Sequence, residues 1–102
     1  MSEYRVLFVH GFMGSAFNWG STRSFLEAKD PQIKTFAVDL LGHANNHPKA
    51  SFDGDVEAHR LLCADLESHL RAFAPTHVVA HSFGLRPSLL VGSQHPSLIP
   101  HL

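Results

Sequence analysis

Short apolar runs alternate with helical stretches along the whole chain, and this alternation limits the fold more than any other feature. The apolar runs at residues 5–10, 35–38 and 77–80 have the length and composition of buried strands. Each run is followed by a loop of glycine or polar residues and then by a helical stretch. Strands connected in this way are parallel, with right-handed crossovers and helices on both faces of the sheet. The sequence therefore predicts an α/β fold, with three αβα layers around a parallel central sheet.

The predicted helices differ in how regularly their apolar residues recur. Between residues 56 and 73 the apolar side chains stand three and four positions apart, and Pro75 ends this long helix. Shorter helices are expected at about residues 19–28 and at residues 83–94. No internal repeat or linker interrupts the pattern, so residues 1–102 are expected to form a single domain.

The composition argues against several classes of partner. The net charge is −1 and the eight Lys and Arg residues are scattered singly, so we expect no binding to nucleic acid. No run approaches the ~20 apolar residues that cross a bilayer, and the first apolar run is too short for a secretory leader. The single cysteine, Cys63, excludes an internal disulfide and fits a reducing compartment. We therefore expect a cytoplasmic protein without a membrane partner.

A serine stands at the corner between the third predicted strand and the last helix. The sequence Ala80-His81-Ser82-Phe83-Gly84 places it between two small residues. A nucleophile elbow has this pattern, because its strained corner exposes the hydroxyl while the following helix passes close to the strand. The same residues also fit a simpler interpretation, in which Ser82 is the N-cap of the helix.

A serine nucleophile needs a base, and the oxyanion that it forms needs two preplaced hydrogen-bond donors. The elbow offers the backbone N–H of Phe83. The loop after the first strand offers the N–H of Phe12, because Gly11 permits close approach and Gly14 lets the chain turn away. These two loops together predict an oxyanion hole.

Three motifs taken together resemble the α/β-hydrolase superfamily in order, spacing and position relative to the strands. They are His10-Gly11-Phe12-Met13-Gly14-Ser15, Asp39-Leu40-Leu41-Gly42-His43 and Ala80-His81-Ser82-Phe83-Gly84. The resemblance covers nearly the whole chain and is closest to the small serine-type esterases, thioesterases and carbon–carbon bond hydrolases. The haloalkane dehalogenase and epoxide hydrolase branches carry an aspartate at the elbow, and Ser82 argues against both.

The resemblance implies a role for each matching residue. Ser82 would be the nucleophile, and the N–H groups of Phe12 and Phe83 would form the oxyanion hole. The substrate would be a small-molecule carboxylic ester or thioester, and no cofactor or metal is implied. Residues that would shape the site are His10, Gly11, Gly14, His81 and Gly84. Residues that would line the pocket are Met13, Trp19, Asp39 and His43.

Part of the family's pattern has no counterpart in this chain. The resemblance aligns residues 5–10 with the third strand of the family, so the chain corresponds to strands 3–5 and helices A–C. The triad acid and histidine follow the elbow helix in the family, and no residue here matches either. We therefore expect a truncated α/β-hydrolase core with little turnover by itself. Its unpaired sheet edges would favour self-association.

Two other functions fit parts of the sequence. One is a non-catalytic remnant of a hydrolase that serves as an interaction fragment. The other is a dinucleotide-binding unit, because Gly11 and Gly14 follow a strand and Asp39 ends the next one. The Gly-x-Gly-x-x-Gly spacing of such units is missing, however. His43 and His47 stand four apart, but the proline-containing loop around them argues against a metal site.

Overall fold

A computed structural model describes residues 3–44, 46 and 54–102 of the chain. It contains one parallel sheet of three strands, which is the predicted sheet. In order across the sheet the strands are β2 (Ile33–Val38), β1 (Tyr4–Val9) and β3 (His77–Ala80). The central strand is therefore the first one in the sequence.

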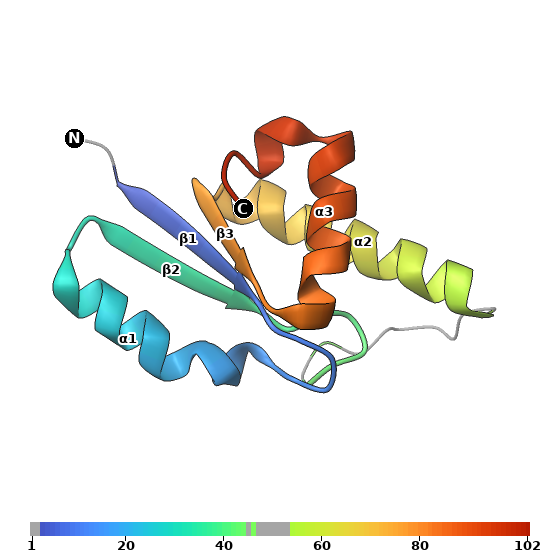
Figure 1. The fold of residues 1–102 in the computed structure, drawn as a ribbon, viewed down its shortest axis with the longest axis horizontal. Helices are drawn as coiled ribbons and strands as arrows, with labels where there is room; N and C mark the ends of the chain where they lie inside the picture. Colours follow the sequence, from blue (N-terminus) through green and yellow to red (C-terminus); the bar gives the residue numbers. More distant parts are fainter. Residues whose placement is uncertain (1–2, 45, 47–53) are drawn as a thin grey trace.

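Helices cover both faces of this sheet, as the alternation of strands and helices predicts (Figure 1). One face carries α1, and the other carries α2 and α3. The helices are α1 (Gly20–Lys29), α2 (Gly54–Phe73) and α3 (Leu85–Gln94). Three short 3₁₀ turns accompany them: η1 (Ala16–Trp19), η2 (Ser82–Gly84) and η3 (Pro96–Leu98).

The main core lies between the sheet and α2. Leu66 and Leu70, four residues apart on α2, are buried with Leu7 and Val9 of β1 in one cluster. This spacing puts both leucines on one face of the helix, so the periodicity that predicts α2 also builds the core. On the other face of the sheet, Phe8 is buried with its ring 4.9 Å from that of Trp19.

Backbone pairing sets the strand ends more than apolar composition does. The apolar run predicts a strand from residue 35, whereas β2 begins at Ile33 because its first residue pairs with Tyr4 of β1. The predicted last helix is also divided, since η2 precedes α3. The strand predicted at residues 77–80 is confirmed by β3.

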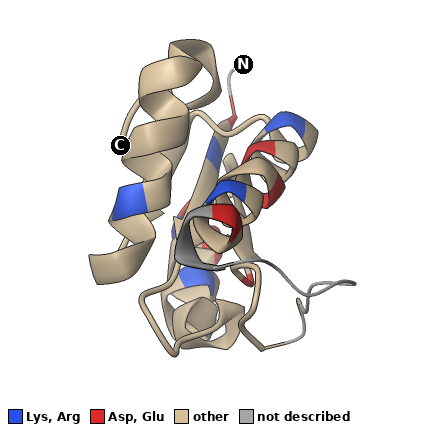
Figure 2. Cartoon of the chain, turned by 90° about the vertical axis from the view of Figure 1, so that its right-hand side faces the viewer, with Lys and Arg blue, Asp and Glu red and all other residues tan. Residues whose placement is uncertain are grey.

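Charges of both signs are spread over the molecule. Figure 2 shows acidic and basic residues interspersed along α2. Two pairs on this helix illustrate the spacing, with Glu57 2.6 Å from Arg60 and Glu67 2.9 Å from Arg71 between their nearest charged atoms. Such exposed pairs add little stability, since the median is about 0–1 kcal/mol.

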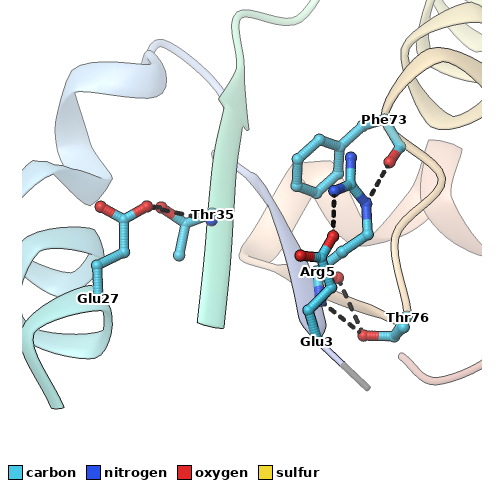
Figure 3. A network of polar contacts seen from close by, with 6 residues as sticks. All are labelled: Glu3, Arg5, Glu27, Thr35, Phe73 and Thr76. Atoms are coloured by element: carbon cyan, nitrogen blue, oxygen red, sulfur yellow. Dashed lines mark hydrogen bonds and ion pairs between the residues drawn. The ribbon is translucent and has the colours of Figure 1, made fainter. Parts of the chain in front are cut away.

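Arg5 ties the end of α2 to the amino end of the sheet (Figure 3). Its Nε donates to the carbonyl oxygen of Phe73 at 2.8 Å, and its guanidinium lies 4.3 Å from the centre of the Phe73 ring. The backbone N–H of Arg5 donates to Thr76 Oγ1 at 2.9 Å. A cation at the carboxyl end of a helix is favoured by the helix dipole, so Arg5 stabilises both the helix end and the following turn.

Ala74, directly after α2, adopts a backbone conformation that glycine prefers. Its φ is 54°, and its N–H donates to the carbonyl oxygen of Leu70 at 2.8 Å. We expect Ala74→Gly to raise the free energy of unfolding by about 0.5–1 kcal/mol, because glycine adopts this conformation without strain. Urea denaturation measures the change. Ala64→Gly, inside the same helix, should instead lower it by about 1 kcal/mol, and a loss of stability in Ala74→Gly would contradict the prediction.

Candidate active site

The carboxyl ends of the three strands meet at one edge of the sheet, where ligands bind in open α/β folds. The His81 N–H donates to the carbonyl oxygen of Val9 at 3.0 Å, which holds the corner after β3 against the end of β1. The Leu40 N–H donates to His10 Nε2 at 2.9 Å and attaches the loop after β2. The three motifs singled out in the sequence therefore lie side by side.

Ser82 occupies the corner between β3 and α3 in a left-handed backbone conformation, with φ of 52°. Its side chain is exposed, and a non-glycine residue in this region carries strain of about 1–3 kcal/mol. The N-cap of the turn that follows is His81, and no side-chain cap hydrogen bond is present there. The interpretation of Ser82 as a helix cap is therefore wrong, and its strained corner needs another explanation.

Gly84 lets the helix after this corner pass directly over β1. A Cβ atom at Gly84 would lie 2.4 Å from the carbonyl oxygen of His10 and 2.8 Å from Val9 Cγ1. Gly11 faces the corner from the other side, where a Cβ would lie 3.0 Å from His81 Nδ1 and 3.4 Å from Ser82 Cβ. Gly84 is therefore needed because backbone atoms leave no room for a side chain, whereas a side chain at Gly11 would require His81 and Ser82 to shift by a few tenths of an ångström.

The loop after β1 is a tight turn that ends on Gly14. The Gly14 N–H donates to the carbonyl oxygen of Gly11 at 3.0 Å, and Met13 within the turn has φ of 66°. Asn18 Oδ1 accepts the Ser15 N–H at 2.8 Å, and a Cβ at Gly14 would lie 2.6 Å from the same oxygen. A side chain at Gly14 would therefore displace Asn18 Oδ1 and break its hydrogen bond with the Ser15 N–H.

Aromatic rings join the two loops that carry the predicted oxyanion donors. The rings of Phe12 and Phe83 meet edge to face, with 5.8 Å between their centres. The His43 ring lies 5.9 Å from that of Phe12 and 6.4 Å from that of Phe83. The backbones of Phe12 and Phe83 are therefore held near each other by a three-ring cluster.

His10 is 1% exposed and joins the loops after β1 and β2 through its two ring nitrogens. Nε2 accepts the Leu40 N–H, so it carries no proton, and Nδ1 lies 2.7 Å from the carbonyl oxygen of Gly11, to which it donates. This pair of bonds assigns a neutral ring with the proton on Nδ1. Burial lowers the pKa of His10, which agrees with that assignment.

A cavity of about 450 Å³ lies beside Ser82. Its walls include most of the residues predicted to shape or line the site. The lining residues are His10, Gly11, Phe12, Met13, Gly14, Asn18, Trp19, His81 and Ser82. Asn18 also lines the cavity, although the sequence alone does not identify it as a site residue. Its position three residues after Ser15 is typical of a residue that caps the start of a helix.

Two predicted pocket residues make other contacts. Asp39 Oδ1 accepts the Ala16 N–H at 2.7 Å, which fixes the start of η1. His43 belongs to the aromatic cluster above, with its ring 5.0 Å from that of His10. Both residues hold the loops around the cavity and are absent from its lining.

No group of three or more His, Cys, Asp and Glu side chains suited to a metal ion occurs within residues 3–44, 46 and 57–102. His47, considered above as a metal ligand, lies outside the described residues. In the part of the chain that the structure describes, no helix combines the length and apolar character needed to span a membrane.

Two curated plant proteins are similar to most of this chain. It is 33% identical over 98 residues to "Probable lysophospholipase BODYGUARD 3" of Arabidopsis thaliana, a match that covers 95% of this chain and 20% of that protein. It is 30% identical over 101 residues to "Probable lysophospholipase BODYGUARD 4" of the same plant, with 92% and 22% covered. The chain thus spans about a fifth of the length of these relatives.

Two crystal structures share the fold. The epoxide hydrolase VrEH1 from Vigna radiata superposes with a TM-score of 0.71 at 20% identity, over 96% of this chain and 30% of that one. E-2-(acetamidomethylene)succinate hydrolase gives 0.69 at 24% identity, over 96% and 35%. At such identities the likeness shows the fold alone. A family model described as "Alpha/beta hydrolase family" matches residues 6–92, which extend from β1 into α3. The chain therefore belongs to the alpha/beta hydrolase family.

Proposed function

We propose that Ser82 is the nucleophile of a serine hydrolase that cleaves carboxylic esters, and thioesters in second place. The observation that carries this proposal is the left-handed backbone of Ser82 at an exposed strand-to-helix corner. Strain at a single exposed serine is expected where the hydroxyl has to project toward a substrate. The cavity beside Ser82 gives that substrate a place to bind.

The reaction would be acyl transfer in two steps. Ser82 Oγ attacks the carbonyl carbon of the ester while a base removes the hydroxyl proton, and the N–H groups of Phe12 and Phe83 hold the oxyanion. The alcohol leaves with a proton, and water then releases the acid from the acyl-enzyme. The triad histidine and acid would come from residues outside this chain, as the family's order of motifs implies.

The names of the relatives support hydrolysis in general. Two relatives are named as lysophospholipases, and the two similar structures are titled as hydrolases. Ser82 stands where an epoxide hydrolase would carry an aspartate, so ester cleavage fits this chain better than epoxide opening. Phe12, Met13 and Trp19 in the cavity wall favour an apolar acyl group.

A fluorophosphonate provides the test, because it phosphonylates nucleophilic serines with loss of fluoride. We expect slow labelling of the chain, at least ten-fold faster labelling when imidazole is added as an external base, and no labelling of Ser82→Ala. Ser93→Ala removes another exposed serine hydroxyl and should label like the unchanged chain. Mass spectrometry of the labelled peptides identifies the serine. Equal labelling of the chain and of Ser82→Ala would leave the non-catalytic remnant as the better interpretation.

Hydrolysis of short-chain nitrophenyl esters tests where the base resides. Intact enzymes that lose a triad member retain about 10³–10⁴-fold acceleration over water, and this chain should show less. Turnover by the chain alone that disappears in Ser82→Ala would mean that the base lies within these 102 residues.

A further inference from the structure

Asn18 is hydrogen-bonded to the residue that follows the turn after β1. Its Oδ1 accepts the Ser15 N–H at 2.8 Å, and its backbone N–H donates to the Ser15 carbonyl oxygen at 3.1 Å. The side-chain bond is the half of a capping box in which the third residue of a helix reaches back to the N-cap. Because a Cβ at Gly14 would lie 2.6 Å from the same oxygen, the amide also packs directly against the last residue of the turn. Asn18 is exposed and lines the cavity beside Ser82, so it belongs both to η1 and to the wall of the site.

The turn itself holds Phe12 and Met13 at its two central positions. The Gly14 N–H donates to the carbonyl oxygen of Gly11 at 3.0 Å, which is the bond that closes a four-residue turn. Met13 has φ of 66°, whereas the φ of Phe12 is not positive. This combination is typical of a type II turn, which favours glycine at the position of Met13. A strained conformation of this kind persists only where contacts around the turn maintain it.

Two other side chains bond to the loop on either side of this turn. His10 Nδ1 donates to the carbonyl oxygen of Gly11 at 2.7 Å, which fixes the start of the turn. Asp39 Oδ1 accepts the Ala16 N–H at 2.7 Å, two residues beyond its end. Among the residues that the structure describes, the Ser15 N–H directly after the turn is bonded only by the amide oxygen named above. The end of the turn therefore depends on that amide.

We propose that Asn18 is a positioning residue, which maintains the turn at residues 11–14 and thereby keeps the Phe12 N–H directed at the oxyanion. The inference rests on the proposed function, because that function gives the Phe12 donor its purpose. Asn18 acts through Ser15 and Gly14. Removal of one oxyanion donor costs about 10²–10³-fold in rate, because such donors work only when they are placed in advance. A turn that relaxes from the strained conformation at Met13 loses part of that factor.

The first test measures labelling of Ser82 by the fluorophosphonate in the presence of imidazole. The phosphonyl oxygen of the probe takes the place of the oxyanion, so the labelling rate depends on where the donors lie. Asn18→Ala should label about ten-fold more slowly than the unchanged chain. Asn18→Leu has a similar shape without the acceptor and should be slowed equally, so either variant can decide if the other does not fold.

Two further variants serve as controls for the labelling rate. Asn18→Gln keeps a neutral amide oxygen at a position where capping boxes often have glutamine, so its rate should stay within about two-fold of the unchanged chain. Phe17→Ala alters the neighbouring side chain of η1, which is 90% exposed, and should leave the rate unchanged. A slow rate that returns in Asn18→Gln would support the role of the amide oxygen.

Amide hydrogen exchange follows the turn without any chemistry at the serine. In Asn18→Ala, exchange at Gly14 and Ser15 should rise about twenty-fold, because the turn opens more often. Loss of an exposed cap lowers the melting temperature by about 4–8 °C, so exchange at buried Leu66 should rise about five-fold or less.

The two measurements separate this inference from the proposed function. Exchange at Gly14 that rises no more than exchange at Leu66, or Asn18→Ala that labels as fast as the unchanged chain, would overturn the role of Asn18 alone. If the unchanged chain is not labelled at Ser82, the proposed function fails, and the purpose assigned to Asn18 fails with it.

Discussion

Replacing Gly84 with alanine is expected to lower the free energy of unfolding by about 3 kcal/mol, because the new methyl group would overlap backbone atoms. The nearest of these, the carbonyl oxygen of His10, would lie 2.4 Å from the Cβ. The backbone at the end of β1 cannot move away without a loss of stability, since β1 is the central strand and His10 is buried. Urea denaturation followed by circular dichroism measures the loss.

The same change should impair the site more than the fold. Pushing the start of the helix away from β1 would move the N–H of Phe83, so imidazole-assisted labelling of Ser82 should fall at least ten-fold in protein that is still folded. Gly92→Ala is the matched control in α3, because its Cβ would lie 3.4 Å from Ile99 at ordinary contact distance. The free energy of unfolding of Gly92→Ala should rise by up to about 1 kcal/mol, because alanine has the higher helix propensity. Unchanged stability of Gly84→Ala would show that the corner is looser than the distances imply.

Replacing His10 with alanine is expected to lower the free energy of unfolding by about 3 kcal/mol, as much as the Gly84 substitution. The substitution leaves the Leu40 N–H and the Gly11 carbonyl oxygen without their buried partner and opens a cavity where the loops after β1 and β2 meet. His81→Ala is the matched control, since His81 is exposed and should cost less than about 0.5 kcal/mol. Equal losses in the two variants would contradict the assigned role of His10.

Lowering the pH should reduce the free energy of unfolding through protonation of His10. Because burial holds the pKa of His10 below its ordinary value of 6.5, the unfolded chain binds a proton more readily than the folded one. The stability that neutral His10 contributes is therefore complete above pH 6.5 and is lost as the pH falls below it. Between about pH 7.5 and 5, the free energy of unfolding measured by denaturation should fall more steeply in the unchanged chain than in His10→Gln. Parallel curves would mean that other groups cause the decline.

The sequence predicts the parts of this molecule that depend on local pattern. Apolar spacing locates α2, and a short apolar run locates β3, because one face of each must be buried. Glycine positions locate the turn at Gly14 and the corner at Gly84, since a side chain there would collide with neighbouring atoms.

The features that the sequence does not predict depend on which segments of the chain contact one another in the folded structure. Nothing local indicates that His10 would accept a bond from Leu40, thirty residues away. The placement of Asp39 against Ala16 and the covering of Thr35 by α1 are likewise results of packing. Even the beginning of β2 follows from the register with β1. Long-range contacts of this kind leave no periodic trace in a single sequence.

Arg5 and Ser82 lie at opposite rims of the same sheet, which gives protein engineers two regions to vary separately. At the amino-terminal rim, Arg5 forms hydrogen bonds with Phe73 and Thr76. Ser82, with its strained backbone, lies at the carboxyl-terminal rim. Distant sites usually contribute additively to stability. Ala74→Gly at the amino-terminal rim would therefore give a more stable protein, in which destabilising substitutions at the carboxyl-terminal rim can be studied while the chain stays folded.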